Sequence, residues 1–194
     1  MRLEISLQGA GVRSLADAMA AIGEGKARRA YARAINRVGD GAITQTSRAL
    51  AKQTGLKVGV TRKALSNPIR ATPARLEFFK RVRGGDIALK YFGARETRKG
   101  VSAAPFGQRR IFPAHFIKGG LFPKRVALGM NGHVMEADTG ATRWGRPFNL
   151  AQSGVILPEQ LVTGQSRAAF EAQAARLAPR VEHEIRVITK GVVS

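Results

Sequence analysis

The chain has no cysteine among its 194 residues. Disulfide bonds, thiolate metal sites and cysteine nucleophiles are therefore excluded, and we expect folding in a reducing compartment or without regard to redox conditions. Aromatic residues are also few, with one Trp, two Tyr and nine Phe. The apolar fraction of 44% is rich in alanine, so we expect a modest core that neighbouring subunits help to complete.

Acidic residues are scarce, with 13 Asp and Glu against 33 Lys and Arg, which gives a net charge of +20. The excess is confined to residues 26–125, which hold 24 basic and four acidic side chains. Residues 1–25 and 126–194 are nearly neutral, at −1 and +1. So uneven a charge favours a polyanionic neighbour, either nucleic acid or an acidic protein, over a basic surface kept for solubility.

Long apolar runs are missing as well. No run approaches 18 consecutive apolar residues, so we expect no transmembrane helix and no membrane partner. The first 14 residues include Glu4 and no extended apolar segment, so they are not expected to act as a signal peptide.

Catalytic and metal-binding patterns are not found. The sequence has no GxSxG, P-loop or dinucleotide-binding motif. His133 and Glu136 are three apart and would face opposite sides of a strand, so we expect both to be exposed. His183, between two glutamates, lacks zinc-ligand spacing, and His115 is expected to be half-buried in a strand. We therefore predict no catalytic residue, no metal site, no cofactor and no enzymatic activity.

Motifs for reading nucleic-acid sequence are absent too, including zinc fingers, the RRM signature and a KH-type loop. Any contact with nucleic acid should therefore involve the phosphate backbone and weaken with salt.

The most informative stretch that is present spans residues 26–53. Small and apolar side chains recur there at steps of three and four, which predicts an α-helix with basic residues over much of its remaining surface. Gly39 and Gly41 flank Asp40 near its middle, and each glycine costs a helix about 1 kcal/mol relative to alanine. The sequence leaves open whether this is one continuous helix, a kinked helix, or two helices joined at these glycines.

Other helices are expected on both sides of this one. Ser14 resembles the N-cap of a short helix that stops at Gly23 or Gly25. Gly55 should end the long helix, and Thr61 could cap a brief turn before Pro68. The C-terminal segment 166–190 shows helical spacing, with Ser166 as a cap, Lys190–Gly191 as a stop, and Pro179 as a kink or restart.

Alternation predicts several strands in the remaining sequence. Residues 83–86 should turn between two of them, and Asn131–Gly132 is a preferred pair for a two-residue hairpin between 125–130 and 133–137. Residues 93–110 have no period and are expected to form a flexible basic loop. The expected strands are residues 2–7, 69–82, 87–92, 111–117 and 155–158.

These elements predict an α+β fold in a single domain, residues 1–194. A long N-terminal helix and a C-terminal helix would pack on a small antiparallel sheet or hairpins, with an extended basic loop. The parts are a helical region 1–60, a β-rich basic region 68–158 with the loop 93–110, and a C-terminal helix in 159–194.

Two sets of residues are candidates for contacts with other molecules. Basic residues of the β-rich region would face DNA or an acidic partner: Arg75, Lys80, Arg81, Arg83, Lys90, Arg95, Arg98, Lys99, Arg109 and Arg110. Small, apolar and aromatic residues would pack against neighbouring subunits: Ala30, Tyr31, Ala34, Ile35, Val38, Trp144, Phe170 and Leu177. Trp144, between Arg143 and Arg146, could instead stack on a base, but an interface or core position is favoured.

Three stretches together resemble the minor tail protein Z family of long-tailed bacteriophages. RRAYARAINRVGDGAITQTSRALAKQTGLK followed by RKALS is similar to the family's N-terminal helical block. RRIFPAHFI and the hairpin ending GHVMEADTG are similar to its central β region, and the C-terminal amphipathic segment completes the likeness. The resemblance spans most of residues 26–190, and AINRVGDGAITQ and RIFPAHFI match best.

This resemblance implies a structural virion protein of the tail or neck, assembled in the host cytoplasm. Such a protein completes the head-proximal end of the tail as a homo-oligomeric ring, which we expect to be a hexamer. Its partners would be tail terminator, tail tube or head-closure proteins, with genomic DNA in the lumen as a further candidate. A soluble, sequence-nonspecific nucleic-acid-binding accessory protein is the alternative.

Overall fold

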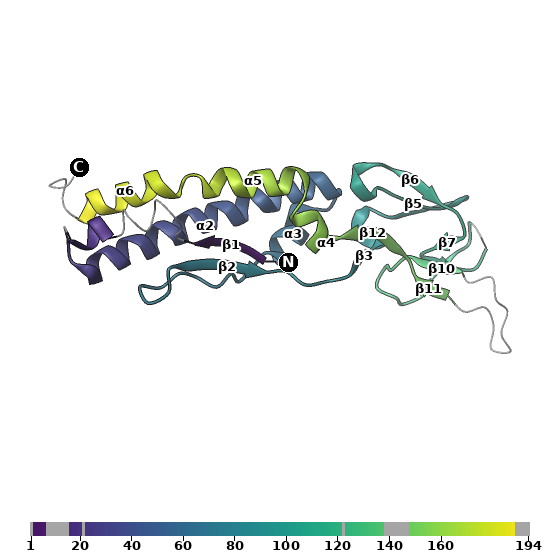
Figure 1. Cartoon of the computed structure of the whole chain (residues 1–194). Helices are drawn as coiled ribbons and strands as arrows, with labels where there is room; N and C mark the ends of the chain where they lie inside the picture. Colours follow the sequence, from purple (N-terminus) through teal and green to yellow (C-terminus); the bar gives the residue numbers. More distant parts are fainter. Residues whose placement is uncertain (1, 7–15, 21, 122, 138–147, 189–194) are drawn as a thin grey trace.

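The computed structural model describes residues 2–6, 16–20, 22–121, 123–137 and 148–188. The chain is elongated, with a helical region and one two-stranded antiparallel sheet at one end and the other small antiparallel sheets at the other end (Figure 1). The predicted α+β class is confirmed, because a long N-terminal helix, C-terminal helices and short antiparallel strands all occur. The predictions for Ser14 as a cap, for Trp144 and for Lys190–Gly191 lie outside the described residues.

Helix α2 (Glu24–Thr54) is the central element of the helical region, against which the other helices pack. It is one continuous helix across both glycines near its middle, so the continuous form of the predicted helix 26–53 is confirmed. It ends as predicted at Gly55, whose φ of 79° is left-handed and whose N–H donates to the Ala51 carbonyl at 2.9 Å. Before α2, residues 16–20 and 22 are helical.

Gly39 and Gly41, near the middle of α2, are contact positions. A Cβ on Gly39 would come within 2.6 Å of the Phe78 ring, so the missing side chain lets that ring lie directly on the helix backbone. A Cβ on Gly41 would lie 3.2 Å from Oε1 of Gln173, the end of a flexible side chain. Only Gly39 therefore has a rigid neighbour that requires glycine.

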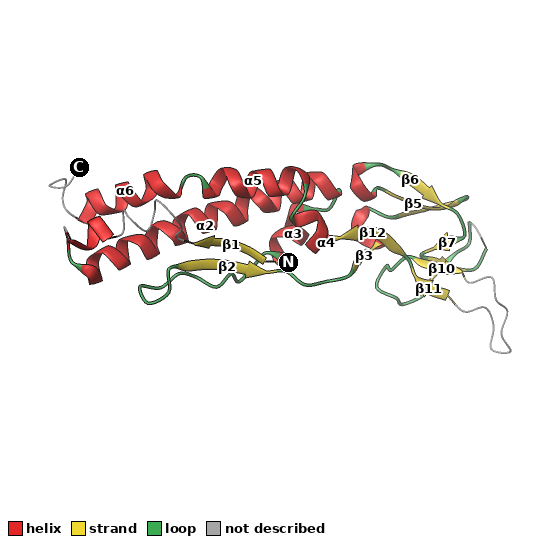
Figure 2. Cartoon of the chain, in the orientation of Figure 1, coloured by secondary structure: helices red, strands yellow, loops and turns green. Residues whose placement is uncertain are grey.

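The C-terminal segment packs along α2 as two helices, α5 (Gly164–Ala174) and α6 (Leu177–Ile188) (Figure 2). The predicted single helix 166–190 is interrupted at residues 175–176. Pro179 falls in the first turn of α6, so the restart alternative holds there. The shared core joins Ile35 and Val38 to Phe78 and Phe170, and Tyr31 to Val181.

Ser166 is not the N-cap of α5. The cap position is Thr163, and the buried Ser166 hydroxyl donates to the carbonyls of Gln160 at 2.5 Å and Thr163 at 2.9 Å. The capping role falls to Gln53 in the last turn of α2, whose Oε1 accepts the Ser166 N–H at 3.1 Å. Its Nε2 donates to the Gln160 carbonyl at 3.0 Å, so one side chain fixes α5 to the end of α2.

Two short helices complete the helical region. Helix α3 (Val58–Ala64) begins before the predicted cap Thr61, whose buried hydroxyl donates to the Ser47 carbonyl at 2.9 Å instead of capping a turn. Helix α4 (Leu157–Leu161) takes over part of the predicted strand 155–158, which ends at Ile156.

Strand β1 (Arg2–Ser6) confirms the predicted strand 2–7 and pairs antiparallel with β2 (Glu77–Arg81). The predicted hairpin across residues 83–86 is wrong. Strand β3 (Asp86–Ala88) pairs with β12 (Gln152–Ile156). Strands β2 and β3 do not pair with each other because their side chains join different cores. Phe78 of β2 packs in the core on α2, whereas Ile87 of β3 packs in the core around Val155 and Leu161.

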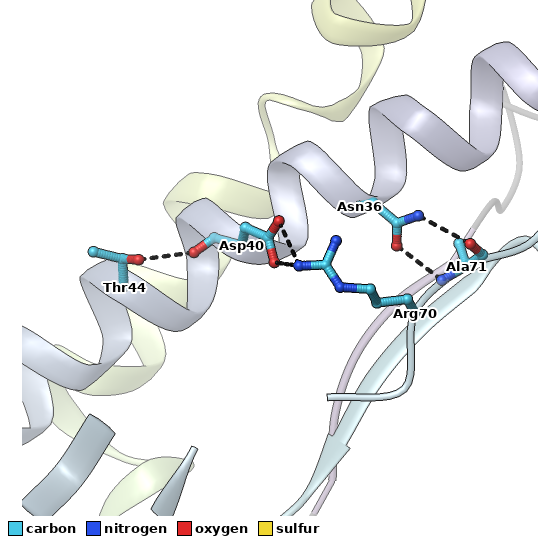
Figure 3. Close-up of polar contacts among 5 residues, drawn as sticks. All are labelled: Asn36, Asp40, Thr44, Arg70 and Ala71. Atoms are coloured by element: carbon cyan, nitrogen blue, oxygen red, sulfur yellow. Dashed lines mark hydrogen bonds and ion pairs between the residues drawn. The ribbon is translucent and has the colours of Figure 1, made fainter. Parts of the chain in front are cut away.

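Polar contacts fix the segment before β2 to α2 (Figure 3). The Asn36 side chain donates to the Ala71 carbonyl and accepts the Ala71 N–H, both at 2.9 Å, as a paired strand would. One turn further on, Arg70 pairs with the Asp40 carboxylate at 2.7 Å, while the Thr44 hydroxyl donates to the Asp40 carbonyl. Ala71 is buried, whereas the Arg70–Asp40 pair is about half exposed.

We expect Asn36→Ala to lower the free energy of unfolding by about 1–3 kcal/mol, because both backbone groups of buried Ala71 lose their partner. Asp40→Ala is the matched control on the same face of α2, and loss of its exposed ion pair should cost less than about 1 kcal/mol. Urea unfolding of the two variants measures the difference. Equal effects would contradict a special role for the Asn36 contact.

The β region, which runs from β3 to β12, contains a three-stranded antiparallel sheet where a flexible loop was predicted. Strands β4 (Arg95–Thr97), β5 (Gly100–Ala103) and β6 (Arg110–Phe112) are ordered side by side. The loop prediction for 93–110 is wrong because Val101 and Ala103 alternate into the core and are fully buried. Of two single-turn 3₁₀ helices, η1 (Leu89–Phe92) precedes β4 in the chain and η2 (Pro105–Gly107) connects β5 to β6.

The remaining strands are very short. They are β7 (His115–Phe116), β8 (Lys118–Gly119), β9 (Val126–Ala127), β10 (Met135–Ala137) and β11 (Phe148–Leu150). The predicted strand 111–117 is divided into β6 and β7 by Pro113 and by Ala114, which has a φ of 60°.

The Asn131–Gly132 turn forms, but the hairpin around it does not. Both residues have positive φ, 47° and 68°, and the His133 N–H donates to the Met130 carbonyl at 3.0 Å. The flanking strands pair elsewhere, however: β9 with β8, and β10 with β7 and β11.

Candidate partner-binding surface

The ten basic residues predicted to face an anionic partner lie in separate places. Arg75, Lys80 and Arg81 lie in or next to β2, beside α2. Five others belong to the three-stranded sheet β4–β5–β6 and its turns: Arg95, Arg98, Lys99, Arg109 and Arg110. Arg83 and Lys90 fall between the two groups in the chain. The structure therefore does not bring all ten into one surface.

Several of these charges are used within the chain. Lys80 donates to the Ser66 carbonyl, and Arg75 lies 5.1 Å from the centre of the Phe79 ring and 3.8 Å from Glu77. Arg109 donates to the Ser102 hydroxyl at 3.2 Å, and Arg110 lies over the Phe112 ring at 4.7 Å. The side chains of Arg81, Arg83, Arg95, Arg98 and Lys99 make no hydrogen bond or ion pair with other described residues.

The turn between β4 and β5 presents Arg98 and Lys99 together. The Thr97 hydroxyl fixes this turn by donating to the Gly100 carbonyl at 2.8 Å and accepting the Lys99 N–H at 3.3 Å. Gly100 has a φ of 130°, and a Cβ there would overlap the Phe112 carbonyl oxygen. Arg98 and Lys99 are thus exposed at the end of a turn whose conformation is fixed by the hydrogen bonds of Thr97.

A cavity of about 670 Å³ opens beside this turn. Arg98 and Lys99 line it together with Lys118 of β8, His115 of β7, and Arg125. Arg125 is ion-paired with Glu96, and both side chains are mostly buried. Arg98, Lys99 and Lys118 have no ion pair with another described residue, so they supply the remaining positive charge. The sequence did not point to Lys118 of β8 or to Arg125 just before β9, because strands of two residues are too short to show alternation.

Exposed apolar side chains accompany this charge. Of the eleven large apolar residues exposed in the described part of the chain, eight lie between residues 91 and 150. Leu121 and Val126 are the most exposed, at 88% and 69%. The others are Tyr91, Phe106, Ile111, Leu128, Phe148 and Leu150. Strands β6 and β11 are edge strands within the described residues, so the β region combines apolar groups with open backbone edges.

The predicted subunit-packing residues of α2 need correction. Ala30, Tyr31, Ala34 and Ile35 have no exposed surface in the single chain, and Val38 has only 6%. They pack against residues of the same chain, so they are not available to a neighbouring subunit. Phe170 and Leu177 are also partly buried in this core. The small and apolar residues of α2 do form a packing face, but this face is covered by other elements of the same chain.

The histidines differ from one another in their surroundings. His133 was predicted to be exposed but is half-buried, with Nε2 2.6 Å from Nζ of Lys90. Burial, and secondarily the Lys90 charge, lowers the pKa of His133. Glu136 is exposed and His115 half-buried, as predicted. Within the described ranges, no three His, Asp or Glu side chains are grouped so that they could hold a metal ion.

The chain matches no family model, no curated protein and no solved structure. A search of the described helices finds none with the length and apolar character needed to cross a membrane. The candidate surface therefore rests on its own geometry: a cationic cavity, exposed apolar side chains and open strand edges in the β region.

Proposed function

We propose that the chain is a structural protein of a bacteriophage tail or neck. In this role it completes the head-proximal end of the tail and helps to join the tail to the head. The observation that carries the proposal is the concentration of exposed apolar side chains and edge strands in the β region of an elongated chain, where a partner can cover them. The resemblance of most of residues 26–190 to the minor tail protein Z family supplies the biological setting.

The helical region and the β region take different parts in this proposal. The helical region has a closed core and serves as a rigid support, since its apolar stripe is buried by its own chain. The β region contacts neighbouring copies in a symmetric ring, for which we propose a hexamer, and an acidic surface of a tail terminator, tail tube or head-closure protein. The cationic cavity beside Arg98 and Lys99 provides the complementary charge.

The association surface can be tested on the purified chain. We expect the double variant Leu121→Ser/Val126→Ser to weaken self-association at least about tenfold, because it removes two exposed apolar contacts without opening the core. Val187→Ser is the matched control, as Val187 is also exposed, at 57%, but lies in α6. Light scattering over a concentration series measures the change, and an equal effect of both variants would contradict a β-region interface.

A nucleic-acid-binding accessory protein is the second candidate, favoured by the unpaired charges of Arg98 and Lys99. A salt titration separates the two proposals. DNA affinity that falls steeply with salt, from a monomer with no affinity for tail proteins, would support the accessory protein. Ring formation with negligible binding of free DNA would support the structural protein.

A further inference from the structure

A second cationic cavity lies in the helical region and shares no lining residue with the first. It measures about 480 Å³ and is bounded by α2 on one side and by the α5–α6 junction on the other. Arg37 enters from α2, Arg176 from the junction, and Arg180 and His183 from α6. Since residues 176, 180 and 183 are four and three apart, they lie along one side of the helix that begins there.

The described residues balance the positive charge of this cavity only in part. None of the described lining residues is acidic, and the neighbouring Glu184, whose side chain is only 10% exposed, already pairs with Arg180 and Arg33. One Glu184 oxygen accepts from Arg180 at 2.5 Å and the other pairs with Arg33 at 3.3 Å. Exposed Glu182 on α6 does not line the cavity.

Arg37 and Arg176 are the unpaired cations of the cavity. Both are exposed, and neither side chain has a hydrogen bond or ion pair with another described residue. The acids of α2 and α5 cannot supply one, because each has its own arginine: Glu24 with Arg28, Asp40 with Arg70, and Glu171 with Arg167.

Gly41 also forms part of the wall. Glycine weakens a helix relative to alanine, and Gly41 has neither a positive φ nor a rigid neighbour that would require it. What its missing side chain does provide is space between α2 and Gln173 at the cavity wall. The open wall is therefore a second feature, independent of the arginines, that suits an occupant.

We propose that this cavity binds a phosphate-bearing anion between Arg37 and Arg176. Guanidinium groups match the oxygens of phosphate with paired, charge-assisted hydrogen bonds. The volume falls within the range of small-ligand sites, and the lining is dominated by polar side chains, which favours an anion over an apolar ligand. The phosphate could belong to a small soluble compound or to a nucleic-acid backbone. This inference does not rest on the proposed tail function.

Calorimetric titration with sodium pyrophosphate and with a 12-nucleotide single-stranded DNA, at constant ionic strength, tests the site. We expect saturation at one pyrophosphate per chain, with at least tenfold weaker binding in Arg37→Gln and in Arg176→Gln. Arg29→Gln and Arg48→Gln are matched controls, because both arginines are exposed on α2 outside the cavity. Gly41→Leu should also abolish binding by filling the space without changing the charge, with circular dichroism verifying its fold.

The outcomes separate the possible sources of the phosphate. Pyrophosphate binding that depends on Arg37 and Arg176 indicates a small phosphorylated ligand, and the same dependence for the oligonucleotide alone indicates a nucleic-acid backbone. Either result supports the site. Equal losses in the control variants would show general attraction to a basic surface, and no saturable binding of either probe would show no site; both would overturn the proposal.

Discussion

Phe78→Ala is expected to lower the free energy of unfolding by about 3–5 kcal/mol, the usual range for removing a buried aromatic ring. The ring is 2% exposed and lies between β2 and the backbone of α2, in a cluster with Ile35, Val38 and Ala71. Its loss would leave a cavity against Gly39 that helix backbone cannot fill. Chemical denaturation measures the change.

The reciprocal substitution, Gly39→Ala, should also destabilise the chain, by about 1–3 kcal/mol. The new methyl group would enter the space of the Phe78 ring, at 2.6 Å, and this overlap should outweigh the gain of about 1 kcal/mol in helix propensity. Gly41→Ala is the control, because only the flexible end of Gln173 lies near, and it should be neutral or stabilise by up to about 1 kcal/mol.

A double-mutant cycle makes this contact testable. In Gly39→Ala/Phe78→Ala, the methyl group occupies space that the ring has vacated, so the loss should be smaller than the sum of the two single losses. Additive losses, or a Gly39→Ala chain as stable as the parent, would show that the ring does not lie on the helix at this position.

Asp86→Ala is expected to cost about 2–3 kcal/mol, because a charged acceptor is removed from several donors at once. The Asp86 carboxylate accepts the Ser153 N–H at 3.0 Å, the Ser153 hydroxyl at 3.1 Å and the Gly154 N–H at 2.9 Å. These bonds bridge the irregular middle of the β3–β12 pair, where the regular register is interrupted. Ser153 is only 3% exposed, so water cannot fully replace the lost acceptor.

Asp86→Asn is the matched variant, since it keeps one acceptor oxygen, and it should lose less stability than Asp86→Ala. Amide hydrogen exchange should show faster exchange at residues 153 and 154 in both variants, with little change at the β4–β5 pair. Unchanged protection of these two amides would contradict the assigned role of the carboxylate.

Long periodic segments of the sequence predicted the helical region well. Residues 26–53 repeat at helical spacing over many turns, and α2 begins and ends within two residues of that prediction. The sequence left the Gly39–Gly41 question open because the answer depends on Phe78, which is distant in the chain and meets Gly39 only after folding.

The β region was predicted less well because its strands are two to five residues long, too short for alternation to be distinguished from chance. The turn at Asn131–Gly132 was predicted from local chemistry, but strand pairing depends on contacts across the chain. Gln53 and Asp86 were missed for the same reason: their partners lie 113 and 67 residues away.

For the candidate surface, too, local features were predicted from the sequence and contacts between distant residues were not. Charge excess in residues 26–125 pointed to basic residues such as Arg98 and Lys99, which do border a cavity. The α2 stripe was assigned to other subunits because periodicity reveals a packing face without revealing what covers it. The exposed apolar residues of the β region now take the role of subunit contacts in the proposal.

A cryo-electron microscopy reconstruction of the head–tail junction of phage particles that encode this chain tests the proposed function most directly. The proposal predicts a symmetric ring of copies at the head-proximal end of the tail, with the β regions at the contacts between copies or with the adjoining ring. Particles that are complete and infectious but contain no copy of the chain would contradict it.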